Sequence, residues 1–319
     1  MSKLPVSIII DDPAPGIHVY YHHVPGHTLA DGQKLLPFVP NDMLYDFCDL
    51  VEEYGLGGKF TVVPMPGCQG DLMHGLKGVS EETLVDWIST VRTRIMPYFD
   101  ICPEILTHAG AIDLATGESL PMNEKEWCVG QTRETLTPYI ARAVELLDQA
   151  GLTPTGVTSP WDFGKTNEGE YQQAISRAFD QVLGVKDAWY FLHSRRHCPD
   201  VRPQLVLNED GRRLVSIFGT FTDYFWSCID TTDTSDELVR RTADHYITAD
   251  GKAGDLIELV EAGCPPVLLT HWQSLFSNGR RTGLRALRLV CERMRTHLSD
   301  RVEWVNMSEL MRRTLNGAI

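Results

Sequence analysis

The chain has 319 residues, 43% of them hydrophobic, with a composition typical of a globular protein. The formal net charge of −14, without any Lys/Arg-rich segment, argues against nucleic acid or an anionic membrane surface as a partner and favours neutral or cationic ligands. No apolar segment approaches the roughly 20 residues of a membrane-spanning helix, and eight scattered cysteines without a C-x-x-C pair predict reduced thiols.

The first predicted strand begins near residue 5, which leaves no room for a signal peptide and predicts a cytoplasmic protein. Apolar strands then alternate with amphipathic helices, the pattern of a parallel sheet covered by helices. In chain order we predict strands at VSIII, KFTVV, PEILTH, TGVTS, RLVSIFGT, PVLLT and VEWVN. The predicted helices are 40–54, 80–99, 132–150, 170–179, 236–246, 255–261 and 282–297. No linker interrupts this order, so we predict one α/β barrel domain over residues 1–319.

Two adjacent aspartates, Asp11 and Asp12, end the first predicted strand. Such a pair often caps a helix or lies in a solvated turn, but here Pro13 and Pro15 prevent a helix from starting at once. Buried carboxylates are costly unless they are paired or bound to a metal. We therefore predict that the two carboxylates face a polar pocket, where one binds a cation and the other acts as a general base.

Polar residues also follow other predicted strands. His108 ends PEILTH, residues 159–161 follow TGVT, and His271 ends VLLTH. Each histidine alone has the alternative of a hydrogen-bonded structural role. In α/β barrels, however, the C-terminal ends of the strands form the face that carries the active site. We therefore expect all these residues to share one pocket with the two aspartates.

The segment IHVYYHHVPGH holds four histidines, at positions 18, 22, 23 and 27. Neighbouring residues of an extended chain point to opposite sides, so we expect His22 or His23 to face the site, with a solvated loop as the alternative. Trp161, in the turn TSPWDFG, is either a core residue or an aromatic surface for a sugar ring, and DYFW (223–226) has the same two interpretations. Trp161 and His23 are the predicted substrate contacts.

Five segments resemble the motifs of the polysaccharide deacetylases, a family of the glycoside hydrolase/deacetylase barrel superfamily. From residue 8 to residue 271 they are, in order, IIIDDP, GGKFTVV, EILTHAGAID, TSPWDFG and LLTH. They match the DD pair, the GxKxTFF-like strand, the H-x-x-x-H motif, the R-x-P-x-G-like turn and the L-x-H strand end of that family. The resemblance implies a distorted, seven-stranded (β/α) barrel.

The resemblance also implies roles for individual residues. Asp11 would be the catalytic base, Asp12 and His108 would be metal ligands, and His271 would be the general acid that protonates the leaving amine. The chemistry of the family is metal-assisted hydrolysis of an N-acetyl amide. The implied cofactor is a divalent metal, with zinc as the expected ion.

Two positions differ from the family motifs. Ile112 stands where the second histidine of H-x-x-x-H is expected, and Ser159 stands where the arginine of the third motif is expected. Asp11 therefore lacks its usual orienting partner. A tight site needs a third ligand, for which the candidates are Asp113, His22 and His23.

Three functions agree with this sequence. The first is a metal-dependent deacetylase-like hydrolase that acts on a soluble saccharide or a small amide. The second is a metal-free glycoside-hydrolase-like enzyme that uses Asp11 or Asp12 with another carboxylate. The third is a non-catalytic carbohydrate-binding barrel. All three imply a saccharide or small-molecule partner, no nucleic acid and no membrane, and they leave oligomerisation open. Fold alone does not choose among them, but metal content would.

Overall fold

The computed structural model describes residues 3–23, 26, 28–30, 32–196, 198 and 200–319. In this part of the chain, seven parallel strands follow one another through their backbone pairings. They are β1 (Leu4–Asp11), β2 (Gly58–Val62), β5 (Phe99–Pro103), β8 (Gly156–Thr158), β9 (Asp187–Ser194), β11 (Arg212–Gly219) and β12 (Val267–His271). A further strand, β13 (Val302–Trp304), pairs in parallel with the beginning of β1.

The strands form two sheets that meet on both sides. One sheet has the order β12-β1-β2-β5, and the other has the order β10-β11-β9-β8, in which β10 (Gln204–Glu209) is antiparallel. A parallel bridge between Glu104 and Thr158 joins β5 to β8. On the other side, Thr220 donates its backbone N–H to the carbonyl of Val267 at 3.0 Å. Backbone contacts thus pass through all seven strands, as the predicted distorted barrel requires.

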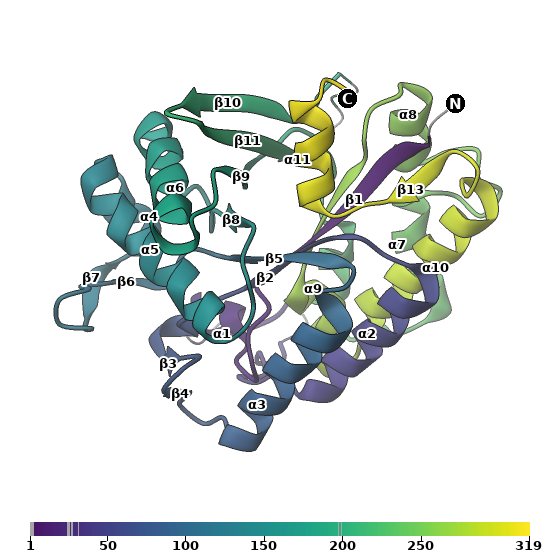
Figure 1. The fold of residues 1–319 in the computed structure, drawn as a ribbon. Coiled ribbons are helices and arrows are strands. Elements are labelled where there is room, and N and C mark those ends of the chain that lie inside the picture. Colours follow the sequence, from purple (N-terminus) through teal and green to yellow (C-terminus); the bar gives the residue numbers. More distant parts are fainter. Residues whose placement is uncertain (1–2, 24–25, 27, 31, 197, 199) are drawn as a thin grey trace.

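Helices lie around the outside of these strands (Figure 1). They are α1 (Val19–His23), α2 (Asn41–Tyr54), α3 (Glu81–Thr90), α4 (Glu124–Cys128), α5 (Arg133–Gln149), α6 (Glu168–Leu183), α7 (Asp236–Tyr246), α8 (Asp255–Glu261), α9 (Trp272–Phe276), α10 (Thr282–His297) and α11 (Met307–Leu315). Two hairpins, β3 (Gly70–Asp71) with β4 (Gly75–Leu76) and β6 (Gly110–Ile112) with β7 (Ser119–Asn123), extend from the loops. Six of the seven predicted helices are confirmed, to within a few residues at their ends. The predicted helix 80–99 is α3 followed by a π-helical segment, Val91–Ile95, and Phe99 already begins β5.

Strand β1 is buried because it has a neighbour on each side. From Val6 to Asp11 each of its residues is buried, since β2 and β12 pair with its two edges. Gly58 is required at the start of β2, because a Cβ there would lie 1.8 Å from the carbonyl oxygen of Ile8. The register places Asp11 directly beside His271 on β12. The first and last motif residues are therefore neighbours in the sheet.

Aromatic side chains fill the largest core cluster, between the sheet and the helices around it. The ring of Phe47 on α2 lies 5.5 Å from that of Trp272, and Phe60 on β2 lies 5.7 Å from the same ring, between centroids. All three side chains are buried. Edge-on packing of this kind adds to the stabilisation that burial gives. It fixes the strand β2 and the first residues after β12 against α2.

The predicted secondary structure differs from the observed one in several places. The third strand is β5, which ends at Pro103, so most of PEILTH is a loop. Its residues Ile105 and Leu106 look like strand because they are fully buried, but the carboxylate of Glu124 accepts backbone N–H groups that a sheet would otherwise pair. Strands β9 and β10 were not predicted at all. In β9, the continuous apolar run of residues 188–192 lacks the alternation that marks a half-exposed strand.

Other composition-based expectations agree with the structure. All eight cysteines are free thiols, and six of them are buried. Among the described residues, none forms a helix that is both long and apolar enough to cross a membrane.

Candidate active site

A cavity of about 540 Å³ lies at the C-terminal ends of the strands. It contains the residues that the sequence analysis singled out by their places after the strands, together with His23. The residues are Asp11, Asp12, His23, His108, Ser159, Trp161 and His271. In this order they belong to the end of β1, to α1, to the loop after β5, to the loop after β8 and to the end of β12. The prediction that one pocket holds these residues is confirmed.

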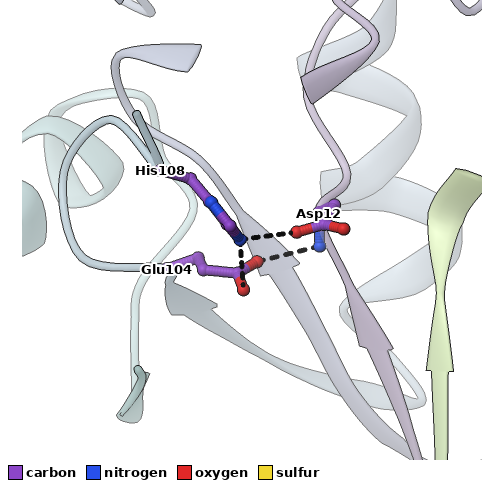
Figure 2. Close-up of side chains that lie close together, drawn as sticks. All are labelled: Asp12, Glu104 and His108. Atoms are coloured by element: carbon purple, nitrogen blue, oxygen red, sulfur yellow. Dashed lines mark hydrogen bonds and ion pairs between the residues drawn. The ribbon is translucent and has the colours of Figure 1, made fainter. Parts of the chain in front are cut away.

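Three buried side chains meet at one point of this cavity (Figure 2). The Nε2 atom of His108 lies 3.0 Å from Oδ1 of Asp12 and 3.3 Å from Oε1 of Glu104. The backbone N–H of Asp12 donates to Oε2 of Glu104 at 2.8 Å. One ligand atom from each residue lies within 4.8 Å of the others. We call Asp12, Glu104 and His108 the acidic triad.

The acidic triad fits a divalent metal. Oδ1 of Asp12 is buried and has no hydrogen-bond partner among the described residues, although it faces His108. Two carboxylates and one imidazole are donors that zinc and related divalent ions accept. Three protein ligands also leave coordination positions for water and substrate, as catalytic sites require. The geometry therefore suits a catalytic ion better than a closed structural one.

Charge stabilises this arrangement. Burial opposes ionisation of Asp12, but His108 beside it holds the pKa of that carboxyl well below its usual range. Burial also opposes the charge of His108, but Glu104 and Asp12 raise the pKa of His108 well above its ordinary value. The acidic triad thus consists of charged groups that compensate one another inside the protein.

None of the three predicted candidates for the third ligand belongs to the acidic triad. Asp113 lies at the β6–β7 hairpin, where its carboxylate accepts the backbone N–H of Ala115 at 2.8 Å. His22 packs edge-on against Tyr21, with 5.3 Å between the ring centroids. His23 stacks on the ring of His108 instead, at 4.0 Å between centroids. The structure places Glu104 in the position for which these residues were considered.

The remaining histidines of the cluster have other surroundings. His18 is buried, and its Nδ1 lies 2.6 Å from the carbonyl oxygen of Leu36, which is a structural contact. His27 lies outside the described residues. The expectation of an extended chain at His22 and His23 is wrong, because both belong to helix α1. Only His23 of this pair reaches the cavity.

Asp11 has a cationic partner after all. Lys59 on β2, which is fully buried, makes an ion pair with Oδ1 of Asp11 and donates to Oγ1 of Thr158 at 2.6 Å. Its ammonium also lies 4.8 Å from the ring centroid of Phe191. Burial raises the pKa of Asp11 to about 7, although Lys59 acts in the opposite direction. Asp11 can therefore accept and release a proton near neutral pH, as a general base must.

His271 lies in the same cavity and is held by Asp223. Its Nδ1 is 2.9 Å from Oδ2 of Asp223, and its backbone N–H donates to the same oxygen at 3.1 Å. The ring of Trp226 lies edge-on to the imidazole, with 5.2 Å between centroids. Burial lowers the pKa of His271, but the hydrogen bond and charge of Asp223 raise it to about 9. The imidazole is therefore protonated at neutral pH and can donate a proton.

We expect the Asp223→Asn substitution to lower the pKa of His271 from about 9 toward its ordinary value of about 6.5. The carboxylate favours the charged ring, whereas burial favours the neutral one, so the variant should lose the imidazolium at neutral pH. Besides Asp223, the charged groups that act on this ring are Asp11 and Asp12. An NMR titration of His271 measures the shift, and an unchanged midpoint would assign the high pKa to those two aspartates.

Backbone conformation supports a functional role for this region. Asp12, His108 and Trp161 have φ angles of 72°, 51° and 50°, in the left-handed region that costs energy for residues other than glycine. Such strain persists only where surrounding contacts hold it. At His108 the holding contact is Glu124, whose Oε2 accepts the backbone N–H of His108 at 2.8 Å. The side chain of Glu124 is completely buried.

No protein-family profile matches this sequence, and no curated protein matches it either. A solved structure from Mycobacterium smegmatis, assigned provisionally as a polysaccharide deacetylase, aligns with 87% of this chain and 78% of its own chain. The sequence identity is 15% and the TM-score is 0.50. The chain shares the polysaccharide deacetylase fold.

Two further solved structures align with the chain less closely. A mutant of a CE4 family pseudoenzyme is 9% identical, with a TM-score of 0.43, and covers 97% of this chain and 68% of its own. A deacetylase solved with substrate is 11% identical, with a TM-score of 0.42, and covers 98% of this chain and 92% of its own. Neither adds to the argument at these TM-scores.

The two positions that depart from the motifs have other surroundings in this structure. Ile112 is buried on β6, and the carboxylate comes from Glu104, which precedes His108 by four residues instead of following it. Ser159 hydrogen-bonds the hydroxyl of Tyr171 at 2.9 Å, while Lys59 takes the position beside Asp11. The carboxylate beside His108 and the cation beside Asp11 thus come from positions other than 112 and 159.

Sequence reasoning missed the polar partners of the predicted residues. Lys59 and Glu104 carried a signal, since each is a charged residue at or beside a strand of otherwise apolar character. Asp223 was noted only within DYFW, whose Trp226 does line the cavity. Gln273, which hydrogen-bonds Oδ2 of Asp12, carried no such signal.

Trp161 stands at the mouth of the cavity. Its side chain is 42% exposed, which argues against the alternative of a core residue. The indole lies 4.6 Å from the ring of His108 and 4.9 Å from that of His23, between centroids. An exposed aromatic face beside reactive groups suits the apolar face of a sugar ring.

Proposed function

We propose that this protein is a metal-dependent hydrolase that removes an N-acetyl or similar acyl group from a saccharide or small amide. The observation that carries the proposal is the acidic triad in the same cavity as Asp11 and His271. Amide hydrolysis requires a metal-binding group, a base and an acid. The acidic triad would bind the metal, Asp11 is a base with a pKa of about 7, and His271 is an acid with a pKa of about 9. The deacetylase fold supports the same conclusion.

Asp12, Glu104 and His108 would hold the ion, which when bound polarises the amide carbonyl and acidifies a water molecule. Asp11 takes a proton from the attacking water, and Lys59 fixes the carboxylate for this transfer. His271 gives a proton to the departing amine. Asp223 accepts the Nδ1–H of His271, which leaves the Nε2–H free to donate.

The remaining lining residues would bind the sugar. Trp161 offers an exposed aromatic face, and His23, stacked on His108, forms part of the same wall. Contacts with ring C–H groups on one side and polar atoms on the other are typical of saccharide sites. We infer that these two residues orient the sugar so that its acyl group reaches the acidic triad.

Protein purified without chelator, and then reconstituted with zinc, tests the proposal. We expect release of free amine from N-acetylglucosamine oligomers, loss of that activity after chelation, and recovery when zinc is restored. An aryl glycoside that carries no amide provides the comparison. Glycoside cleavage that survives the chelator, with no amine released, would support the metal-free glycosidase and contradict the proposal.

The His271→Ala variant should reduce turnover of an N-acetyl substrate by about 10²- to 10⁴-fold, because the leaving amine loses its proton donor. Metal content and folding should change little. The control is an acyl substrate whose leaving group is stable without a proton, and there most of the defect should disappear. An equal defect on both substrates would mean that His271 is structural or a ligand.

A further inference from the structure

We propose that the substrate carries an anionic group, a carboxylate or a phosphate, which Arg195 and Lys165 bind at the rim of the cavity. This inference rests on the proposed function, because it specifies the substrate of that site. It departs from the expectation that the overall charge of −14 favours neutral or cationic ligands. The rim carries positively charged side chains, although the net charge of the chain is negative.

Among the described residues that line the cavity, Arg195 is a cation whose side chain has no partner. It follows the last residue of β9 and lines the cavity, and its backbone N–H donates to the carbonyl of Gly219 at 2.7 Å. This bond anchors the residue to the end of β11. Within the described part of the chain, its guanidinium makes neither a hydrogen bond nor an ion pair. A planar guanidinium on an anchored backbone suits bidentate binding of a carboxylate or phosphate.

Lys165 adds a second cation to the same rim. Its Nζ lies 3.0 Å from Asp162, which also pairs with Lys125 at 3.1 Å. Hydrogen bonds from Lys165 and Lys125 lower the pKa of Asp162, so its single negative charge is shared between two lysines. Two lysines thus surround the one carboxylate of Asp162, and with Arg195 the cations that line this part of the cavity outnumber that carboxylate.

His193, another lining residue, has its partner outside the cavity. His193 lines the cavity, and its Nε2 lies 2.9 Å from Oε1 of Glu168. The same oxygen accepts the hydroxyl of Tyr190 at 2.6 Å. Glu168 does not line the cavity. Of the carboxylates that do, Asp162 pairs with two lysines and Asp11, Asp12 and Glu104 are buried, whereas Arg195 is exposed.

The cavity is therefore polarised. Its inner end holds the acidic triad and Asp11, and the rim formed after β8 and β9 holds Lys165 and Arg195. A volume of about 540 Å³ accommodates a saccharide unit with a charged substituent. With the acyl group at the inner end, the substituent reaches the rim. The structure thus assigns the substrate to the class of N-acylated saccharides that bear a carboxylate or phosphate.

Calorimetric binding to the metal-loaded protein tests this inference without requiring turnover. Three ligands form a matched set: N-acetylglucosamine, its 6-phosphate, and N-acetylmuramic acid, which carries a carboxylate. We expect at least one anionic ligand to bind more tightly than the neutral sugar. The Arg195→Gln variant should bind that anionic ligand about 10- to 100-fold more weakly, the range of a charge-assisted hydrogen bond. Its affinity for the neutral sugar should stay the same.

Arg196→Gln provides the control, because Arg196 is the next residue, is exposed and does not line the cavity. We expect it to bind all three ligands like the parent protein. Equal binding of the neutral and anionic ligands by the parent protein would overturn the inference, as would an equal loss for all three in Arg195→Gln. Amide hydrolysis without anion preference would overturn this inference alone, whereas anion preference without hydrolysis would overturn the proposed function.

Discussion

The Glu104→Ala variant should lose its metal almost completely. Removing one of three protein ligands leaves two, which is too few for a tight site. The loss in affinity should exceed the roughly 10- to 100-fold that removal of an outer hydrogen-bonding partner costs. Metal content after gel filtration, measured by elemental analysis against the parent protein, gives the result. The same outcome is expected for Asp12→Ala.

The Asp113→Ala variant is the matched control for Glu104→Ala. Both replace an acidic residue close to His108 in sequence, but the carboxylate of Asp113 caps a turn at the β6–β7 hairpin. We expect this variant to keep the metal. If Asp113→Ala lost the metal and Glu104→Ala retained it, the acidic triad would be the wrong ligand set, and the original motif alignment would be closer to the truth.

The Lys59→Met variant should lower the free energy of unfolding by about 3–5 kcal/mol, the usual effect of removing one member of a buried ion pair. Lys59 is fully buried and the side chain of Asp11 is 5% exposed, so water cannot replace the lost ammonium. Thr158 would also lose its hydrogen bond from Lys59. Urea denaturation, monitored by tryptophan fluorescence, measures the change.

Two further variants make the Lys59 prediction specific. Combining Lys59→Met with Asp11→Asn removes both charges, and we expect it to recover part of the lost stability, because no buried charge is left alone. Lys125→Met breaks an exposed ion pair with Asp162 and should cost less than about 1 kcal/mol. A Lys59→Met variant as stable as Lys125→Met would mean that the buried pair contributes little.

The sequence predicted the parts of the site that depend on local pattern. Asp11, Asp12 and His271 follow apolar strands, and this placement was enough to bring them to one end of the barrel. The long helices were also predictable, because their apolar faces repeat with helical period. His108 was placed in the correct pocket even though the strand assigned to it was wrong.

The partners of these residues could not be predicted in the same way. Lys59 is 48 residues from Asp11, and Asp223 is 48 residues from His271. Such contacts depend on which strands become neighbours, and local patterns do not contain that information. The strand prediction for PEILTH was wrong for a related reason. A buried apolar segment resembles a strand, and the sequence does not show that the distant carboxylate of Glu124 accepts its backbone N–H groups.

The pairing of β1 with β12 has a consequence for how this site could change. Asp11 and His271 are register partners, so the backbone ladder of the sheet sets the spacing between the proposed base and the proposed acid. Arg195 and Lys165, by contrast, lie just beyond β9 and β8, where insertions and substitutions are tolerated. Substrate preference can therefore diverge between relatives of this chain while the proton-transfer geometry stays constant. If the proposed function holds, the spacing of the proton-transfer groups is set by the sheet, and substrate selectivity is set by the loops.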